Sequence, residues 1–127
     1  MSTQFVPDGV GGFVKLSEPV KTVEVLGQPY EIIMRPPDAH DPKLAEVNGY
    51  AEPWSKKLVV LDFEPDSQTV ERPEELKAKV LRHEIVHAFL HESGLRACSW
   101  GDNEEIVDWI AHQGPKIYQA WKEAGAV

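Results

Sequence analysis

Two histidines and a glutamate stand at a spacing that suits metal-assisted hydrolysis. Residues 83–87 read His-Glu-Ile-Val-His, an HExxH pattern. In an α-helix, His83 and His87 project from one face about 6 Å apart along the axis, so both imidazoles can reach one Zn²⁺ ion at about 2.0–2.1 Å. Glu84 follows the first histidine, where its carboxylate can take a proton from a metal-bound water. The motif therefore predicts a zinc hydrolase site with Glu84 as the general base.

A catalytic zinc ion usually has three protein ligands, so a third ligand is expected downstream. The metzincin pattern would place Gly and His at positions 90 and 93, but these are Leu90 and Ser93. Residues 103–108 read Asn-Glu-Glu-Ile-Val-Asp, which resembles the NExxxD segment of the gluzincins, the thermolysin-like zinc peptidases. This resemblance implies that Glu104 is the third zinc ligand and that Asp108 orients His83.

Glu105 is the alternative third ligand. We expect Asp102 to N-cap the helix that follows, and Glu105, three residues later, would then complete a capping box. That role would occupy the Glu105 carboxylate and leave Glu104 for the metal. Adjacent helical residues point about 100° apart, so both carboxylates cannot serve one ion equally well.

The order of the expected elements makes the resemblance more specific. A short β-hairpin, the motif helix and one ligand helix look like the minimal zinc peptidase domains of the ImmA/IrrE type, over residues 47–111. Those are intracellular proteins of bacteria, phages and other mobile elements, and several act on transcriptional repressors. The resemblance implies a protein or peptide substrate. It also implies that the strand at residues 57–62 is an edge strand that binds the substrate backbone by β-addition.

Strand signals come first in the chain and helix signals follow. Two β-hairpins are predicted from β-rich runs around turn residues, at 22–34 and 46–62. Pro73 at a first helical position and Gly94 after the last turn predict a helix over about 73–93. Two further helices are expected, because Gly114-Pro115 should break or kink the chain.

These signals predict an α+β fold: a small antiparallel β-sheet followed by a zincin-like motif helix and two C-terminal helices. At 127 residues, the chain is expected to form a single domain over 1–127, with residues 1–20 loop-like and flexible.

Other side chains near these elements have more ordinary interpretations. His91 extends the metal face of the motif helix, but a histidine in the last turn also favours the negative end of the helix dipole. An oxyanion in the transition state could receive a hydrogen bond from His112 or Tyr118, each of which is otherwise a surface or packing residue. We expect a turn at the polar cluster Asp38, His40 and Asp41. The solvated stripe of the motif helix should contain Lys77, Lys79 and Arg82. Three tryptophans should pack the ligand helix: Trp100, Trp109 and Trp121.

The composition limits the classes of partner that this protein is expected to bind. The net charge is −8, and 13 basic residues scattered among 21 acidic ones do not supply a phosphate-binding surface, so no direct nucleic acid binding is expected. The single cysteine, Cys98, cannot form an internal disulfide. The N-terminus lacks the features of a signal peptide, and no apolar run approaches the roughly 18 residues that span a bilayer. We therefore expect a cytoplasmic protein that does not bind membranes.

A metal-stabilised structural or interaction protein of phage origin, with a non-catalytic zinc site, is the alternative function. A structural zinc site is normally closed by a fourth protein ligand. The residues that could supply it are His91, His112 and Cys98.

Overall fold

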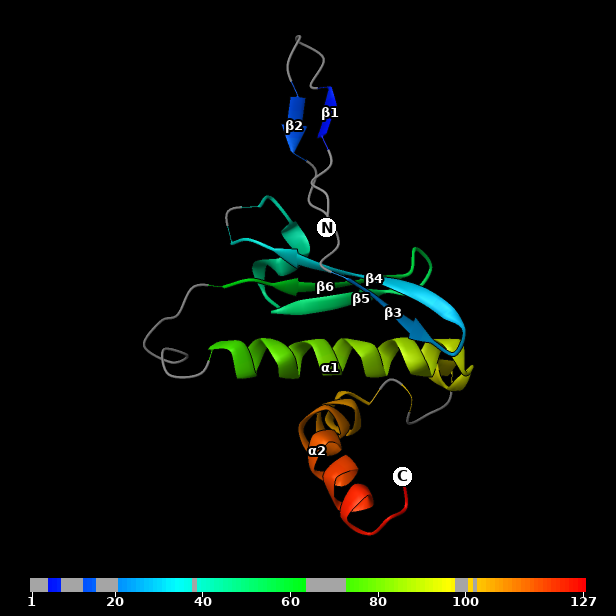
Figure 1. Ribbon diagram of the computed structural model, residues 1–127. Coiled ribbons are helices and arrows are strands. Elements are labelled where there is room, and N and C mark those ends of the chain that lie inside the picture. Colours follow the sequence, from blue (N-terminus) through cyan, green and yellow to red (C-terminus); the bar gives the residue numbers. More distant parts are fainter. Residues whose placement is uncertain are drawn as a thin grey trace.

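The computed structural model describes residues 5–7, 13–15, 21–37, 39–63, 73–97, 101 and 103–127. A four-stranded sheet lies on one side of the long helix α1, and the second long helix, α2, crosses the opposite side of α1 (Figure 1). The elements in chain order are β1 (Phe5–Pro7), β2 (Phe13–Lys15), β3 (Lys21–Val25), β4 (Gln28–Arg35), η1 (Pro42–Ala45), β5 (Gly49–Glu52), β6 (Lys57–Leu61), α1 (Pro73–Glu92), η2 (Leu95–Ala97) and α2 (Glu104–Glu123).

The N-terminal part is not all loop. β1 and β2 pair with each other as an antiparallel two-stranded sheet, whereas the sequence predicted a loop there. The remaining residues of this part lie outside those that the structure describes.

Both predicted hairpins form, and they join into one sheet with the order β3-β4-β6-β5. The prediction of an antiparallel sheet is wrong, because β4 and β6 pair in parallel, with Ile33 opposite Val59. The connection between these strands passes through η1 and β5, so β6 returns in the same direction as β4. The sheet is therefore mixed.

β6 is an inner strand of this sheet. Leu58, Val59 and Val60 are each at most 1% exposed although neighbouring strand residues point to opposite faces. A continuous apolar run of this kind is typical of a strand that is covered on both faces. The edge position expected for residues 57–62 is therefore wrong, and the edge strand on this side is β5.

Helix α1 begins at Pro73 as predicted and ends one residue before the predicted end. Gly94, just past it, has a left-handed φ of +80°, a conformation that glycine adopts without strain. Fully buried Ala88 lets the helix approach the sheet closely, and Leu81 and Ile85 pack beside it against the core. That core consists of Val25, Tyr30, Ile32, Leu58 and Ala88.

Helix α2 differs from its prediction in two ways. Its N-cap is Asn103, whose side-chain oxygen accepts a hydrogen bond from Ile106 N at 3.1 Å, so the capping box of Asp102 and Glu105 is wrong. The helix also continues through Pro115, and the described residues contain two α-helices where three were predicted.

A contact from α1 explains why Pro115 is tolerated. Proline has no N–H, so the carbonyl of Ala111, four residues earlier, loses its helical partner. Arg82 Nε donates a hydrogen bond to this oxygen at 2.6 Å. The side chain from α1 therefore satisfies the carbonyl that proline leaves open.

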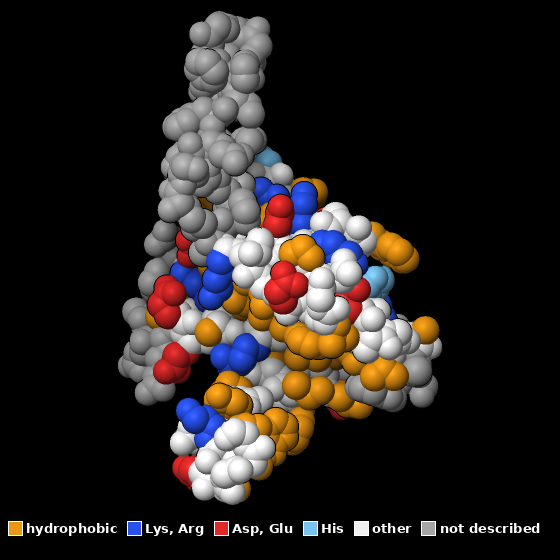
Figure 2. Space-filling view, turned by 45° about the vertical axis from the view of Figure 1, so that its right-hand side comes forward, with side chains coloured by type: hydrophobic (Ala, Val, Ile, Leu, Met, Phe, Trp, Pro, Cys, Tyr) orange, Lys and Arg blue, Asp and Glu red, His pale blue; other side chains and the backbone are white. Residues whose placement is uncertain are grey.

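Only the first half of α2 is anchored. Val107 and Ala111 are buried, whereas every residue after Ile117 is exposed. Trp109 and Trp121 are 58% and 52% exposed, so the packing predicted for them is wrong, and Trp100 lies outside the described residues. Hydrophobic side chains gather in the angle between α2 and the rest of the molecule (Figure 2). None of the helices in the described ranges is long and apolar enough to cross a membrane.

Candidate metal centre

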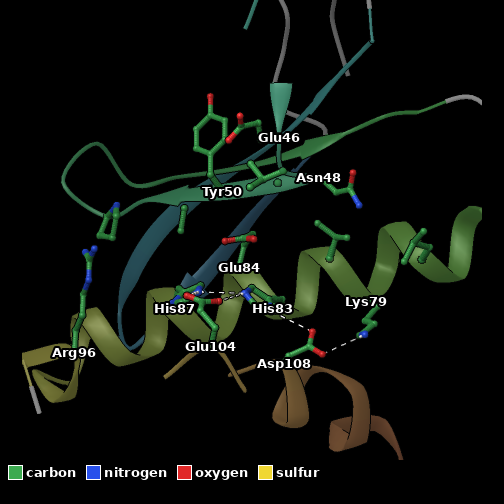
Figure 3. A pocket seen from close by; sticks show the side chains of 16 residues that line it. Glu46, Asn48, Tyr50, Lys79, His83, Glu84, His87, Arg96, Glu104 and Asp108 are labelled. Carbon is green, nitrogen blue, oxygen red and sulfur yellow. Dashed lines mark hydrogen bonds and ion pairs between the residues drawn. The ribbon is translucent and has the colours of Figure 1, made fainter. Parts of the chain in front are cut away.

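Side chains from both long helices converge between α1 and α2. His83 and His87 lie one turn apart on α1, with their Nε2 atoms 3.2 Å from each other. The Glu104 carboxylate reaches them from the first turn of α2, with one oxygen 2.8 Å from His83 Nε2 and the other 3.1 Å from His87 Nε2. Figure 3 shows these three side chains pointing toward one another. The structure thus brings the three expected ligands together, and their role toward a metal stays a prediction.

The distances among these atoms suit one small cation. Ligand atoms about 2.1 Å from a tetrahedral zinc ion lie about 3.4 Å from one another. The three observed separations are slightly shorter, and small side-chain shifts would open the triangle to that size. Imidazole nitrogen and carboxylate oxygen are both donors that zinc accepts. The donor set therefore fits a zinc ion.

The contact between His83 and Asp108 strengthens this argument. Asp108 Oδ1 lies 3.4 Å from His83 Nδ1, so a proton on Nδ1 would face the carboxylate. In a neutral ring, the lone pair of Nε2 then points at the Glu104 carboxylate and at His87. Electron pairs that face one another at such distances need a cation or a proton between them. The same anchoring of the second ring nitrogen is usual for histidines that bind metals.

Glu84 lies beside the two histidines and competes with Glu104 for the role of third ligand. One ligand atom from each of His83, Glu84 and His87 lies within 4.8 Å of the others, so this group can hold a metal ion. Glu84 points from α1 toward β5, however, whereas Glu104 contacts both ring nitrogens directly (Figure 3). The two carboxylates therefore take different positions beside the histidine pair.

Burial sets the ionisation of the site. Glu84 is only 7% exposed, and this burial, opposed by His83 and reinforced by the Glu104 charge, raises its pKa to about 7. Burial lowers the pKa of His87, which favours the neutral imidazole, the form that binds a metal. For Asp108, partial burial raises the pKa, but the ion pair with Lys79 and the contact with His83 outweigh it and lower the pKa. Glu84 can therefore gain and lose a proton near neutral pH.

A cleft of about 730 Å³ opens beside these residues. One wall is α1 and the other is β5 with the residues before it. Gly49 lets the two walls approach, because a Cβ there would lie 2.7 Å from Val80 Cγ1 and 2.8 Å from the Val59 carbonyl oxygen. The same Cβ position is 3.6 Å from Glu84 Cγ, so Gly49 places β5 directly beside the proposed base.

Several other candidates lie elsewhere. Glu105 is exposed on α2 and does not line the cleft. His91 packs against Trp54, with ring centroids 5.1 Å apart. His112 and Tyr118 are exposed on α2 outside the cleft wall.

Of the polar cluster that was predicted to form a turn, His40 and Asp41 lie among the described residues. Asp41 N-caps η1 and accepts a hydrogen bond from the Tyr50 hydroxyl at 2.6 Å. Asp38 and Cys98 lie outside the described residues.

The basic residues of α1 were wrongly expected to form a solvated stripe. The Lys77 side chain is only 11% exposed and pairs with Asp62, Lys79 Nζ lies 3.4 Å from Asp108 Oδ2, and Arg82 binds α2 as described above. The position of Lys79 four residues before His83 on one helical face was a usable signal. Arg96, which lines the cleft from η2, had no such signal.

No protein-family model, characterised protein or solved structure matches this chain.

Proposed function

We propose that this protein is a zinc-dependent peptidase in which His83, His87 and Glu104 hold the ion and Asp108 orients His83. The observation that carries the proposal is the meeting of two imidazole nitrogens and a carboxylate within 3.2 Å, next to a buried glutamate. Zinc in such a site supplies Lewis acidity, which makes water more acidic and stabilises negative charge on a carbonyl oxygen.

In this proposal Glu84 moves the proton. Its carboxylate takes a proton from the attacking water and then delivers it to the nitrogen of the departing amine. In the metal-free protein, burial raises the pKa of Glu84 to about 7, so this group holds a proton more readily than an exposed glutamate does. Among the described strands, none pairs with the outer edge of β5. This edge borders the cleft and can pair with an extended peptide backbone, which supports a peptide as the substrate.

The test compares Glu84→Gln with His83→Ala. The glutamine variant should keep about one zinc per chain by elemental analysis and should lose hydrolysis of a synthetic peptide mixture by roughly 10²- to 10⁴-fold, because an amide cannot accept the proton. His83→Ala should lose the zinc as well. Hydrolysis by Glu84→Gln at the wild-type rate would exclude the peptidase proposal.

The non-catalytic alternative predicts a different result. A structural site would keep its zinc in Glu84→Gln, but the wild-type protein would hydrolyse no peptide in the mixture. Of the residues considered for a fourth ligand, His91 and His112 lie away from the cleft, which favours an open, catalytic site.

A further inference from the structure

The cleft beside the candidate metal centre has two different ends. At one end the ammonium of Lys79 lies 3.4 Å from the Asp108 carboxylate. At the other end, beyond His87, Arg96 extends from η2 along the wall (Figure 3).

Arg96 also lines a second cavity of about 370 Å³. Its other walls include Trp54, from the turn between β5 and β6, and His91. Trp54 is 88% exposed and contacts the His91 ring edge to face. Arg96 thus lines both the cleft and the smaller cavity.

We propose that Arg96 and Trp54 form a subsite that selects peptide substrates by an acidic side chain. This inference rests on the proposed peptidase function, since it names the class of substrate. The planar guanidinium offers paired N–H donors that match the two oxygens of a carboxylate. The indole provides a flat apolar wall that limits water around the ion pair and thereby strengthens it.

The part of the cleft beside the proposed base would disfavour the same side chain. Glu46 and Glu84 line the wall between Lys79 and Arg96 (Figure 3), so a substrate carboxylate placed beside them would face like charges. Repulsion of a substrate carboxylate at other positions increases the specificity for an acidic residue at the Arg96 end. An acidic residue is therefore accepted at the Arg96 end and disfavoured beside the proposed base.

The distance along β5 predicts where the selected acidic residue lies in the substrate sequence. Gly49 lies beside Glu84, and Pro53 lines the cleft four residues further along the chain. An extended chain advances about 3.3 Å per residue, so this span is about 13 Å. The selected side chain should thus lie about two to four residues from the cleaved bond, always on the same side of it.

The experiment profiles cleavage with matched synthetic peptides. One peptide that the protein cleaves is resynthesised with Glu, Gln or Lys at each position within four residues of the cut, once as the C-terminal amide and once as the free acid. Wild type should prefer Glu over Gln at one position by roughly tenfold in kcat/KM, mainly through KM. Arg96→Glu should prefer Lys there, and Trp54→Ala should weaken the preference without reversing it. A preference seen only with the free acids would show that the site reads a chain terminus instead and would overturn the proposal.

Controls separate this inference from the proposed function. Lys122→Glu changes the net charge equally on an exposed part of α2 and should leave the profile unchanged. If Arg96→Glu does not fold, Arg96→Gln should lose the preference. If wild type cleaves none of the peptides, the proposed function fails, and binding of fluorescein-labelled Glu, Gln and Lys versions of one ten-residue peptide to Glu84→Gln still tests the subsite. Equal binding of the three, or an unchanged profile in Arg96→Glu, would exclude it.

Discussion

Glu104 and Glu105 are neighbours of the same chemical type, yet only Glu104 contacts both histidines. We expect Glu104→Ala to leave two protein ligands and to release zinc readily. Glu105→Ala is the matched control and should keep zinc, losing only about 0.3–1 kcal/mol of helix stability near the positive end of the dipole. Asp108→Ala should weaken zinc binding by roughly 10- to 100-fold. Competition with a chromophoric chelator measures all three affinities. Wild-type affinity in Glu104→Ala would transfer the ligand role to Glu84.

Glu84 should also make the stability of the metal-free protein depend on pH. Burial raises its pKa from 4.5 to about 7, so the folded state holds a proton that the unfolded chain has already released. The free energy of unfolding should therefore fall as the pH rises from 4.5 to 7, with a slope of up to about 1.4 kcal/mol per pH unit.

Urea unfolding in the presence of a chelator, with wild type and Glu84→Gln side by side, measures this slope. His87 acts in the opposite direction, because its lowered pKa costs stability as the pH falls. The difference between the two curves isolates Glu84, since both proteins contain His87. Parallel curves over this range would show that Glu84 titrates normally.

The site residues that belong to local motifs could be predicted from the sequence. The HExxH pattern and the NExxxD segment predicted four side chains that do meet in space. Arg96 was not predicted, because its surroundings include the turn before β6, which lies far from it in the sequence. Contacts of this kind depend on the tertiary fold and leave no periodic pattern.

Among the elements, the position of β5 depends on Gly49, because glycine has no Cβ atom to collide with its neighbours. Alanine there would press a methyl group into Val80 and the Val59 carbonyl, at an expected cost of about 1–3 kcal/mol. It would also move β5 away from Glu84 and lower the rate of hydrolysis. Gly114 is the matched control: an added Cβ meets nothing within 4 Å, so Gly114→Ala should stabilise α2 by about 0.5–1 kcal/mol. Thermal unfolding compares the two, and equal stability would contradict the close approach at Gly49.

The contact of Arg82 with the Ala111 carbonyl can be tested by a double-mutant cycle. Arg82→Met should cost about 1–3 kcal/mol, because the carbonyl left open by Pro115 loses its donor. In a Pro115→Ala background the new alanine supplies an N–H to the same carbonyl, so Arg82→Met should cost less. Chemical denaturation of the four proteins gives the coupling energy. Additive costs would mean that the two residues act independently.

Local sequence patterns predict the bounds of several elements but not how these elements contact one another. Both hairpins and the bounds of α1 follow from turn residues, Pro73 and Gly94, which act within a few residues of their own position. The parallel pairing of β4 with β6 joins two hairpins, so it links segments that are far apart in the sequence. The continuity of α2 depends on Arg82, a residue 33 positions before Pro115.

At the scale of the whole molecule, the proposed metal links α1 to α2. His83 and His87 belong to the helix that packs on the sheet, whereas Glu104 belongs to the helix on the far side (Figure 1). Among the described residues, the other anchors of α2 lie in its first half: Val107 and Ala111 are buried, Arg82 binds the Ala111 carbonyl and Lys79 pairs with Asp108, whereas the residues beyond Ile117 are exposed. A metal held between the helices should add to the energy that keeps α2 in place.

Metal removal should consequently loosen one part of the fold before the rest. With a chelator, backbone amides of α2 should exchange hydrogen faster, while those of β4 and β6 stay protected by the core. At free zinc 100 times its Kd, the ion should stabilise the folded state by about 2.7 kcal/mol, which for a chain of this length raises the Tm by roughly 10 °C. Hydrogen exchange followed by mass spectrometry, with and without zinc, measures the local effect. Glu104→Ala should show the loosened α2 even with zinc present, and Glu105→Ala should behave like wild type. If chelation instead accelerates exchange equally in the sheet and in α2, or in neither, the ion does not join the two helices.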